Sequence, residues 1–142
     1  MTGIDPRGPR FTAGVTLVLL AVVLLVPTPV ATTLVAVQAL LFLAGATLGV
    51  HRTPTGLVFR ALVRPRLSPP AQLEDPRPPR FAQGVGLAFT ALALLGYLTG
   101  ATIVAQVAVG LALVAALLNA AFGLCLGCEL YLHGLRLTRR TA

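Results

Sequence analysis

The sequence predicts an all-α integral membrane protein. Four transmembrane helices should form two tandem helical hairpins, with an additional cytoplasmic interfacial helix. The composition indicates the class, because the 142 residues are 56% hydrophobic and only 11% charged, more apolar surface than a soluble domain of this size buries. Four apolar stretches supply the helices, at residues 11–26, 30–50, 82–98 and 101–124. An internal repeat indicates their arrangement.

The four stretches differ in length. About 20 helical residues cross a hydrocarbon core of about 30 Å. Residues 30–50 and 101–124 meet this length, whereas 11–26 and 82–98 also need residues from the membrane interface. Only Pro-Thr-Pro separates the first two stretches, and only Thr-Gly separates the last two. These short separators predict two tight helical hairpins.

The repeat lies at the entry to each hairpin. The segment DPRGPRFTAGV, residues 5–15, returns seventy residues later as DPRPPRFAQGV, residues 75–85, with eight of eleven positions identical. Such self-similarity predicts two copies of one structural unit. Because each copy crosses the membrane twice, both enter from the same side, and a pseudo-two-fold axis along the membrane normal should relate them. The motif also occurs in mid-chain, where it cannot be a leader, so we do not interpret the first copy as a secretory signal.

The charge of +7 comes from eleven arginines and no lysine. In a four-pass chain all of them fall on one side of the membrane, while the two hairpin turns carry no charge. The positive-inside rule therefore predicts a multi-pass protein of the inner or plasma membrane with both termini in the cytoplasm. Nucleic-acid binding is not expected, since the chain has no soluble basic face with aromatic or groove-reading elements.

The chain divides into three parts. Residues 1–64 form the first hairpin and an interfacial helix, 65–80 form a proline-rich cytoplasmic linker with the re-entry motif, and 81–142 form the second hairpin with a cysteine motif and a basic tail. Thr53 can cap a helix over 54–64, with arginines on one face and apolar residues toward lipid. Six prolines make the linker stiff and extended.

The only two cysteines, Cys125 and Cys128, follow the fourth apolar stretch at the cytoplasmic boundary of the membrane. On one continuous helix, thiols spaced at i and i+3 would share a face. A reducing cytosol disfavours a permanent disulfide but allows a dithiol that cycles. The C-terminal end of a helix and the neighbouring Glu129 both disfavour the thiolate. Activation of the pair therefore requires a nearby cation or histidine.

Three residues could activate the pair: His51, Arg52 and His133. Aligning Gly49 with Gly123 sets His51 opposite Cys125, so the pseudo-symmetry predicts His51 at the depth of the cysteines. The candidate catalytic residues are Cys125, Cys128 and His51. The candidate binding residues are Arg52, Glu129 and His133.

Two other interpretations of the cysteines stay open. Together with His133 and either His51 or Glu129 they could hold zinc, but one CxxC without a second compact pair is a weak match, and we assign no metal or other cofactor. Free cysteines are also often small buried residues. A stripe of small residues beside them is expected to form the close helix contact: Ala116, Ala120, Gly123, Gly127 and Gly134. Asn119 is expected to hydrogen-bond across helices.

The motifs DPRPPRFAQGVG, LVRPRL and FGLCLGCELY resemble those of the small bacterial membrane proteins catalogued as domain of unknown function 4395. The resemblance covers nearly the whole chain and implies a four-helix membrane protein without an established activity. Members of that family tend to be encoded beside thioredoxin-like proteins and sulfurtransferases. The resemblance therefore implies thiol or sulfur handling by Cys125 and Cys128, with a soluble partner of either type.

These observations together favour a thiol-redox or sulfur relay through the CxxC motif at the cytoplasmic face. The first alternative is a non-catalytic membrane anchor for a soluble thioredoxin-like or sulfurtransferase partner. The second is a small permeation module for a sulfur anion, which is weakened because no predicted span carries a charge. The sequence contains no recognisable acid–base dyad, phosphate loop or serine triad. A four-helix chain of this size could also form a homo-oligomer.

Overall fold

The computed structural model describes residues 3–142, and within this range the protein is helical and contains no β-strand. Four long helices dominate it: α1 (Arg7–Leu25), α2 (Thr28–Leu48), α4 (Arg77–Thr99) and α5 (Thr102–Phe122). Each of the four is long and apolar enough to cross a membrane. The predicted all-α class with four apolar helices is therefore confirmed.

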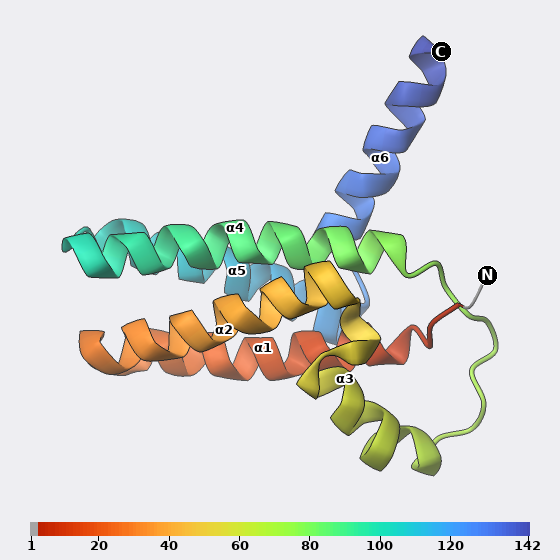
Figure 1. The fold of residues 1–142 in the computed structure, drawn as a ribbon, viewed down its shortest axis with the longest axis horizontal. Coiled ribbons are helices and arrows are strands. Elements are labelled where there is room, and N and C mark those ends of the chain that lie inside the picture. Colours follow the sequence, from red (N-terminus) through yellow and green to blue (C-terminus); the bar gives the residue numbers. More distant parts are fainter. Residues whose placement is uncertain (1–2) are drawn as a thin grey trace.

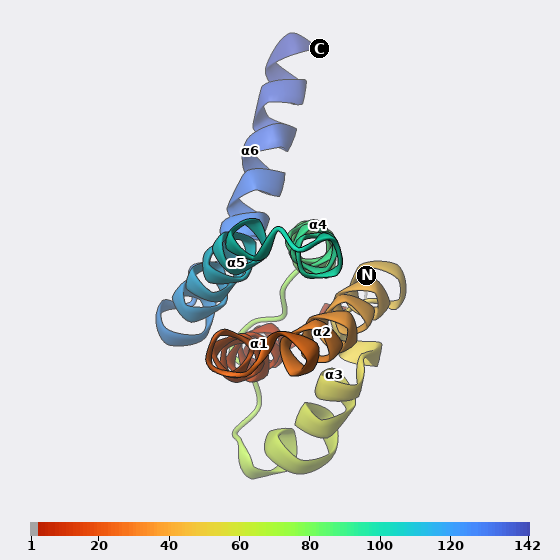
Figure 2. The same ribbon diagram turned by 90° about the vertical axis from the view of Figure 1, so that its left-hand side faces the viewer.

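The four long helices run side by side in a bundle (Figure 1). The turns between α1 and α2 and between α4 and α5 lie at one end of the bundle, and the start of α1, α3 and α6 lie at the other. Viewed along the bundle, α1 and α2 form one layer and α4 and α5 the other (Figure 2). The most extensive packing joins α2 to α4 and α1 to α5. Each hairpin is thus held mainly by the other hairpin, around a core that includes Leu20, Val35 and Ala93.

Two of the helices begin earlier than their apolar stretches suggest. α1 has 19 residues and α4 has 23, because Arg7 and Arg77 already lie in the helices. The prolines near these starts are tolerated, since the first N–H groups of a helix have no intrahelical partner. The irregular linker between Arg66 and α4 is correspondingly shorter than the expected 65–80.

An aspartate two residues ahead holds each of these arginines. The Asp5 carboxylate accepts a hydrogen bond from the backbone N–H of Arg7 at 3.0 Å and pairs with its guanidinium at 2.8 Å. Asp75 makes the same contacts with Arg77, at 2.9 Å and 2.7 Å. The arginine hydrogen bond is the main cause that lowers the pKa of both aspartates. The carboxylates therefore stay ionised at the helix N-termini, where negative charge is favourable.

A helical segment follows α2 and is continuous from Pro54 to Arg66: α3 (Pro54–Val58), a π-turn at Phe59–Val63 and a 3-10 turn at Arg64–Arg66. The expected cap is present, because the Thr53 hydroxyl accepts a hydrogen bond from the N–H of Gly56 at 3.1 Å. Phe59 is buried, with its ring centroid 5.8 Å from that of Phe11 in α1. Leu57, Val58 and Leu62 remain exposed. The segment thus packs on α1 through Phe59, and its other apolar side chains are exposed.

Close packing of α2 on α4 depends on a missing side chain at Gly86. A Cβ added there would lie 2.6 Å from the ring of Phe42, whereas one added at Gly84 meets nothing within 4 Å. We expect Gly86→Ala to lower the free energy of unfolding by about 1 kcal/mol or more, since overpacking forces the ring to shift. Gly84→Ala is the matched control and should not destabilise the bundle. Heating purified protein and measuring the monodisperse fraction by size exclusion compares the two, and equal losses would contradict this packing.

Candidate functional site

The cysteines do not lie on a continuation of α5. That helix ends at Phe122, and Gly123 adopts a left-handed conformation with φ of 69°. The backbone N–H of Gly123 donates to the carbonyl of Asn119 at 3.0 Å, which closes the helix. The expectation of one continuous helix through Cys125 and Cys128 is therefore wrong, because a glycine in the expected small-residue stripe ends the helix instead.

A new helix, α6 (Leu126–Thr141), begins directly after this break, with Cys125 as its N-cap. The backbone N–H of Cys128 donates to the sulfur of Cys125 at 3.3 Å. The two sulfurs are joined in a disulfide, with the Cα atoms 5.2 Å apart. The pair thus occupies the N-terminus of a helix, where free N–H groups and the helix dipole favour a thiolate. The sequence-based expectation that helix polarity opposes the thiolate is wrong.

The first turns of α6 dock on α4. Gly127, between the two cysteines, is buried, and a Cβ added there would lie 2.6 Å from Cα of Ala82. Further along, the rings of Tyr131 and Phe81 have centroids 5.6 Å apart. Beyond this contact α6 projects away from the bundle (Figures 1 and 2). The cysteine pair is therefore fixed to the bundle, whereas most of α6 is not.

The segment described from sequence as a basic tail is thus an amphipathic helix. Its polar face carries Glu129, His133, Arg136 and Arg140. The leucines at 126, 130 and 137 share a neighbouring face, at spacings of four and seven residues, and Gly127 and Tyr131 lie on the side opposite the charged residues, against α4. That periodicity was present in the sequence and could have revealed the helix.

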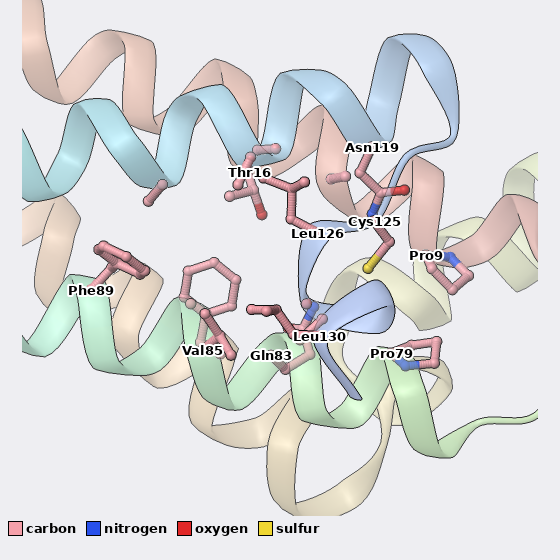
Figure 3. Close-up of a pocket in the computed structure, with 18 of the residues that line it drawn as sticks. Pro9, Thr16, Pro79, Gln83, Val85, Phe89, Asn119, Cys125, Leu126 and Leu130 are labelled. Carbon is pink, nitrogen blue, oxygen red and sulfur yellow. The ribbon is translucent and has the colours of Figure 1, made fainter. Parts of the chain in front are cut away.

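Cys125 borders a cavity of about 310 Å³ between the four long helices and the start of α6. Figure 3 shows its sulfur turned into this space. Most lining side chains are apolar, including the rings of Phe42 and Phe89. Small residues of α5, among them Ala112 and Ala116, leave the room that larger side chains would fill. The disulfide therefore has direct access to an apolar cavity inside the bundle.

Two side-chain amides interrupt the apolar lining, Gln83 from α4 and Asn119 from α5 (Figure 3). Both side chains are partly buried, and among the described residues the buried polar atoms without a partner are instead Oε1 of Gln38 and Nδ1 of His51. The buried hydroxyl of Thr16 also lines the cavity, but it accepts from Nε2 of Gln38 at 3.3 Å. Asn119 was expected to bond across helices. It lines the cavity instead.

The remaining predicted site residues lie elsewhere. His51 lines a separate cavity of about 300 Å³ together with Asp5, Arg60 and Arg64. Arg52 is exposed beside it, and Glu129 and His133 are exposed on α6. The structure thus brings the two cysteines together and places His51 in a cavity that the cysteines do not line.

A cation that the sequence did not single out approaches the cysteines from α1. The guanidinium of Arg10 donates to the carbonyl of Ala120 at 3.4 Å and lies against Gly123, two residues before Cys125. Arg80 does the same for the other hairpin and donates to the carbonyl of Thr47 at 2.7 Å. Both arginines satisfy carbonyls at a helix C-terminus, where a positive charge is favourable. Sequence spacing could not reveal these contacts, because each one joins different hairpins.

His51 lies in an unfavourable place for a positive charge. Burial is the main cause that lowers the pKa of His51, and the charges of Arg52, Arg60 and Arg80 lower it further. Nδ1 of its ring is buried and has no hydrogen-bond partner among the described residues. The folded protein therefore favours the neutral imidazole.

This preference predicts a pH dependence of stability. Because the folded pKa of His51 lies below its ordinary value of 6.5, the stabilisation is present above that value and is lost as the pH falls through the folded pKa. We expect the melting temperature to drop as the pH falls below about 6.5, and to drop less in His51→Gln. His133→Gln, which changes an exposed histidine, should melt like the parent protein at every pH. A parallel fall in all three proteins would contradict this role of His51.

Metal binding was the second interpretation of the cysteines. Within residues 3–142, no three side chains of His, Cys, Asp or Glu come close enough together to hold a metal ion. The zinc site considered from the sequence is therefore not assembled, since the two thiols are joined and His51 lies in another cavity.

Comparison with known proteins identifies the family without adding an activity. No curated protein and no solved structure matches the chain. The family model described as "Domain of unknown function (DUF4395)" matches residues 4–136, which include all four long helices and both cysteines. The chain therefore belongs to the DUF4395 family.

Proposed function

We propose that the protein is a membrane thiol oxidoreductase that exchanges a disulfide between Cys125–Cys128 and a soluble dithiol partner. The observation that carries this proposal is the bonded cysteine pair at the N-terminus of α6. A helix N-terminus stabilises a thiolate, and a thiolate is both the better attacking group and the better leaving group in exchange.

The exchange takes two steps. A thiolate of the partner attacks the sulfur of Cys125, the Cys125–Cys128 bond breaks, and Cys128 leaves as a thiolate that takes a proton from water. The second partner thiol, after losing its proton, attacks the partner sulfur bound to Cys125 and releases the Cys125 thiolate. The partner is then oxidised to a disulfide and the protein is reduced to a dithiol. The N-terminal position of Cys125 favours the second step, because a stabilised thiolate leaves faster.

The membrane placement belongs to the same proposal. The hairpin turns carry no charge, whereas the arginines belong to the helix entries, the 3-10 turn at Val50–Arg52, α3 and its continuation, and α6, all at the other end of the bundle (Figure 1). The positive-inside rule assigns that end to the cytoplasm of a bacterial inner membrane. There α3 and α6 lie in the interface as amphipathic helices, in two parallel repeats of hairpin and surface helix. The polar face of α6, with Glu129 and His133, is then open to a soluble thioredoxin-like partner.

The test measures whether the pair cycles. The full chain in lipid nanodiscs is equilibrated with glutathione buffers of graded redox potential, and free thiols are counted by the gel shift of a maleimide polymer. A reversible two-thiol transition is expected, followed by transfer of two electrons from added reduced thioredoxin. The matched control is Cys125→Ala with Cys128→Ala, which should show neither.

A pair that never changes state, or that cycles in glutathione but never exchanges with a protein dithiol, would overturn the proposal. If the double variant still co-purified with a soluble partner, that result would support the anchor alternative.

A further inference from the structure

We infer that the cavity beside Cys125 binds a quinone, a lipid-soluble ring with two carbonyl oxygens, and that this quinone reoxidises the dithiol. The inference rests on the proposed function and names the electron acceptor of that same site. It starts from the position of the cavity, which lies between helices that can span a membrane and reaches the sulfur of Cys125. A ligand that partitions into the lipid phase can reach such a space.

The size and lining of the cavity suit an aromatic ring. Its volume of about 310 Å³ lies at the lower end of the range found for small-molecule sites. Phe42 and Phe89 offer rings against which a planar ligand can pack. These features would also admit a lipid acyl chain, so the polar groups decide between the two.

Those polar groups are the amides of Gln83 and Asn119, which come from facing walls (Figure 3). Both amides border the cavity and are only partly buried, and an acyl chain cannot offer them a hydrogen-bond partner. A quinone can, because its carbonyl oxygens accept hydrogen bonds from the amide NH₂ groups. After reduction, the hydroxyls of the quinol donate to the amide oxygens. Side-chain amides are unusual in serving both states, since they carry donors and an acceptor.

The redox step balances with the quinone as oxidant. The Cys125 thiolate and the Cys128 thiol give up two electrons and form the Cys125–Cys128 bond. The quinone accepts the two electrons and two protons, one from Cys128 and one from water, and both carbonyls become hydroxyls. The quinol then leaves into the lipid phase. The protein regains the disulfide that the soluble dithiol consumes.

The experiment uses the full chain in nanodiscs and decylubiquinone as the probe. The protein is reduced, freed of reductant and mixed with decylubiquinone, and disulfide formation is followed by the loss of maleimide-reactive thiols. Gln83→Leu with Asn119→Leu should slow this oxidation at least tenfold. Gln106→Leu is the matched control, since Gln106 is exposed on α5 and does not line the cavity. Oxidation by the water-soluble reagent diamide should be equal in all three proteins, which shows that each is folded and has competent thiols.

Binding is measured separately from redox chemistry. Cys125→Ala with Cys128→Ala should still bind decylubiquinone saturably, and the two leucine substitutions should remove that binding. If diamide and thioredoxin cycle the pair but decylubiquinone neither binds nor oxidises it, the quinone inference fails and the proposed function stands. If no oxidant or protein dithiol changes the pair, the proposed function itself fails. Equal quinone oxidation in the parent and the double leucine variant would overturn the role of the amides.

Discussion

Cys125 in a Cys128→Ser variant is expected to be alkylated at neutral pH about tenfold faster than Cys128 in a Cys125→Ser variant. Cys125 is the N-cap of α6, and its sulfur accepts the N–H of Cys128. A tenfold larger thiolate fraction corresponds to about 1.4 kcal/mol, which is within what a helix N-terminus supplies in a favourable geometry. Reaction with iodoacetamide, quantified by mass spectrometry from acid to neutral pH, compares the two thiols.

The positive charge of Arg10 should also favour the thiolate of Cys125. Its guanidinium lies against Gly123, two residues before Cys125, so Arg10→Gln in the Cys128→Ser background should move the onset of alkylation to higher pH. Arg136→Gln, on the exposed part of α6, removes an equal charge and serves as the control. If Cys125 reacted more slowly than a cysteine in an unstructured peptide, the pair would behave as though at a helix C-terminus. That result would contradict the position of Cys125 as the N-cap of α6.

The four long helices could be predicted because their signal is redundant. Each apolar stretch is long, uncharged and bounded by prolines, glycines or arginines, so an error of a few residues leaves the helix in place. The helix starts at Arg7 and Arg77 lie ahead of the apolar stretches and were not predicted. Proline marks a break inside a helix but is also favoured in the first turn, and sequence alone does not distinguish the two cases.

The site was less predictable because it depends on one backbone conformation. Glycine is common within membrane helices, where it permits close packing, and Gly123 belongs to a stripe that suggested this role. Its positive φ instead ends α5, and Cys125 is the N-cap of α6 two residues later. The polarity at the cysteines depends on this break in the helix over residues 123–125. Hydropathy and residue spacing do not report it.

The pseudo-symmetric alignment was informative in a different way. Gly49 and Gly123 both have positive φ and both end a long helix, so aligning them identified equivalent positions. Equivalence across a pseudo-two-fold does not mean contact, however. His51 and Cys125 follow their glycines into separate cavities. The residues that join the hairpins there are Arg10 and Arg80, whose long side chains reach carbonyls of the opposite hairpin.

Gly127→Leu is expected to release the start of α6 from α4. Any side chain at Gly127 collides with the backbone of Ala82, and helix backbones cannot yield as the end of a flexible side chain can. Overpacking of about 2 kcal/mol would speed hydrogen exchange of the hydrogen-bonded amides in residues 129–131 about thirtyfold, because local opening controls that exchange. The displaced turn also carries Cys125 out of the cavity wall. Disulfide exchange with a soluble dithiol should survive, whereas oxidation from the cavity should slow.

Gly134→Leu supplies the matched control on the same helix. A Cβ at Gly134 meets nothing within 4 Å, and leucine is a better helix former than glycine, so amide exchange in α6 should stay equal or slow down. Faster amide exchange in Gly127→Leu together with equal or slower exchange in Gly134→Leu would show that the effect comes from the contact of α6 with α4. It would not come from the helix propensity of leucine. Equal exchange in both variants would mean that Gly127 does not fix the cysteine pair to the bundle. The cavity would then have no defined wall at Cys125, and the link between the disulfide and the membrane interior would be lost.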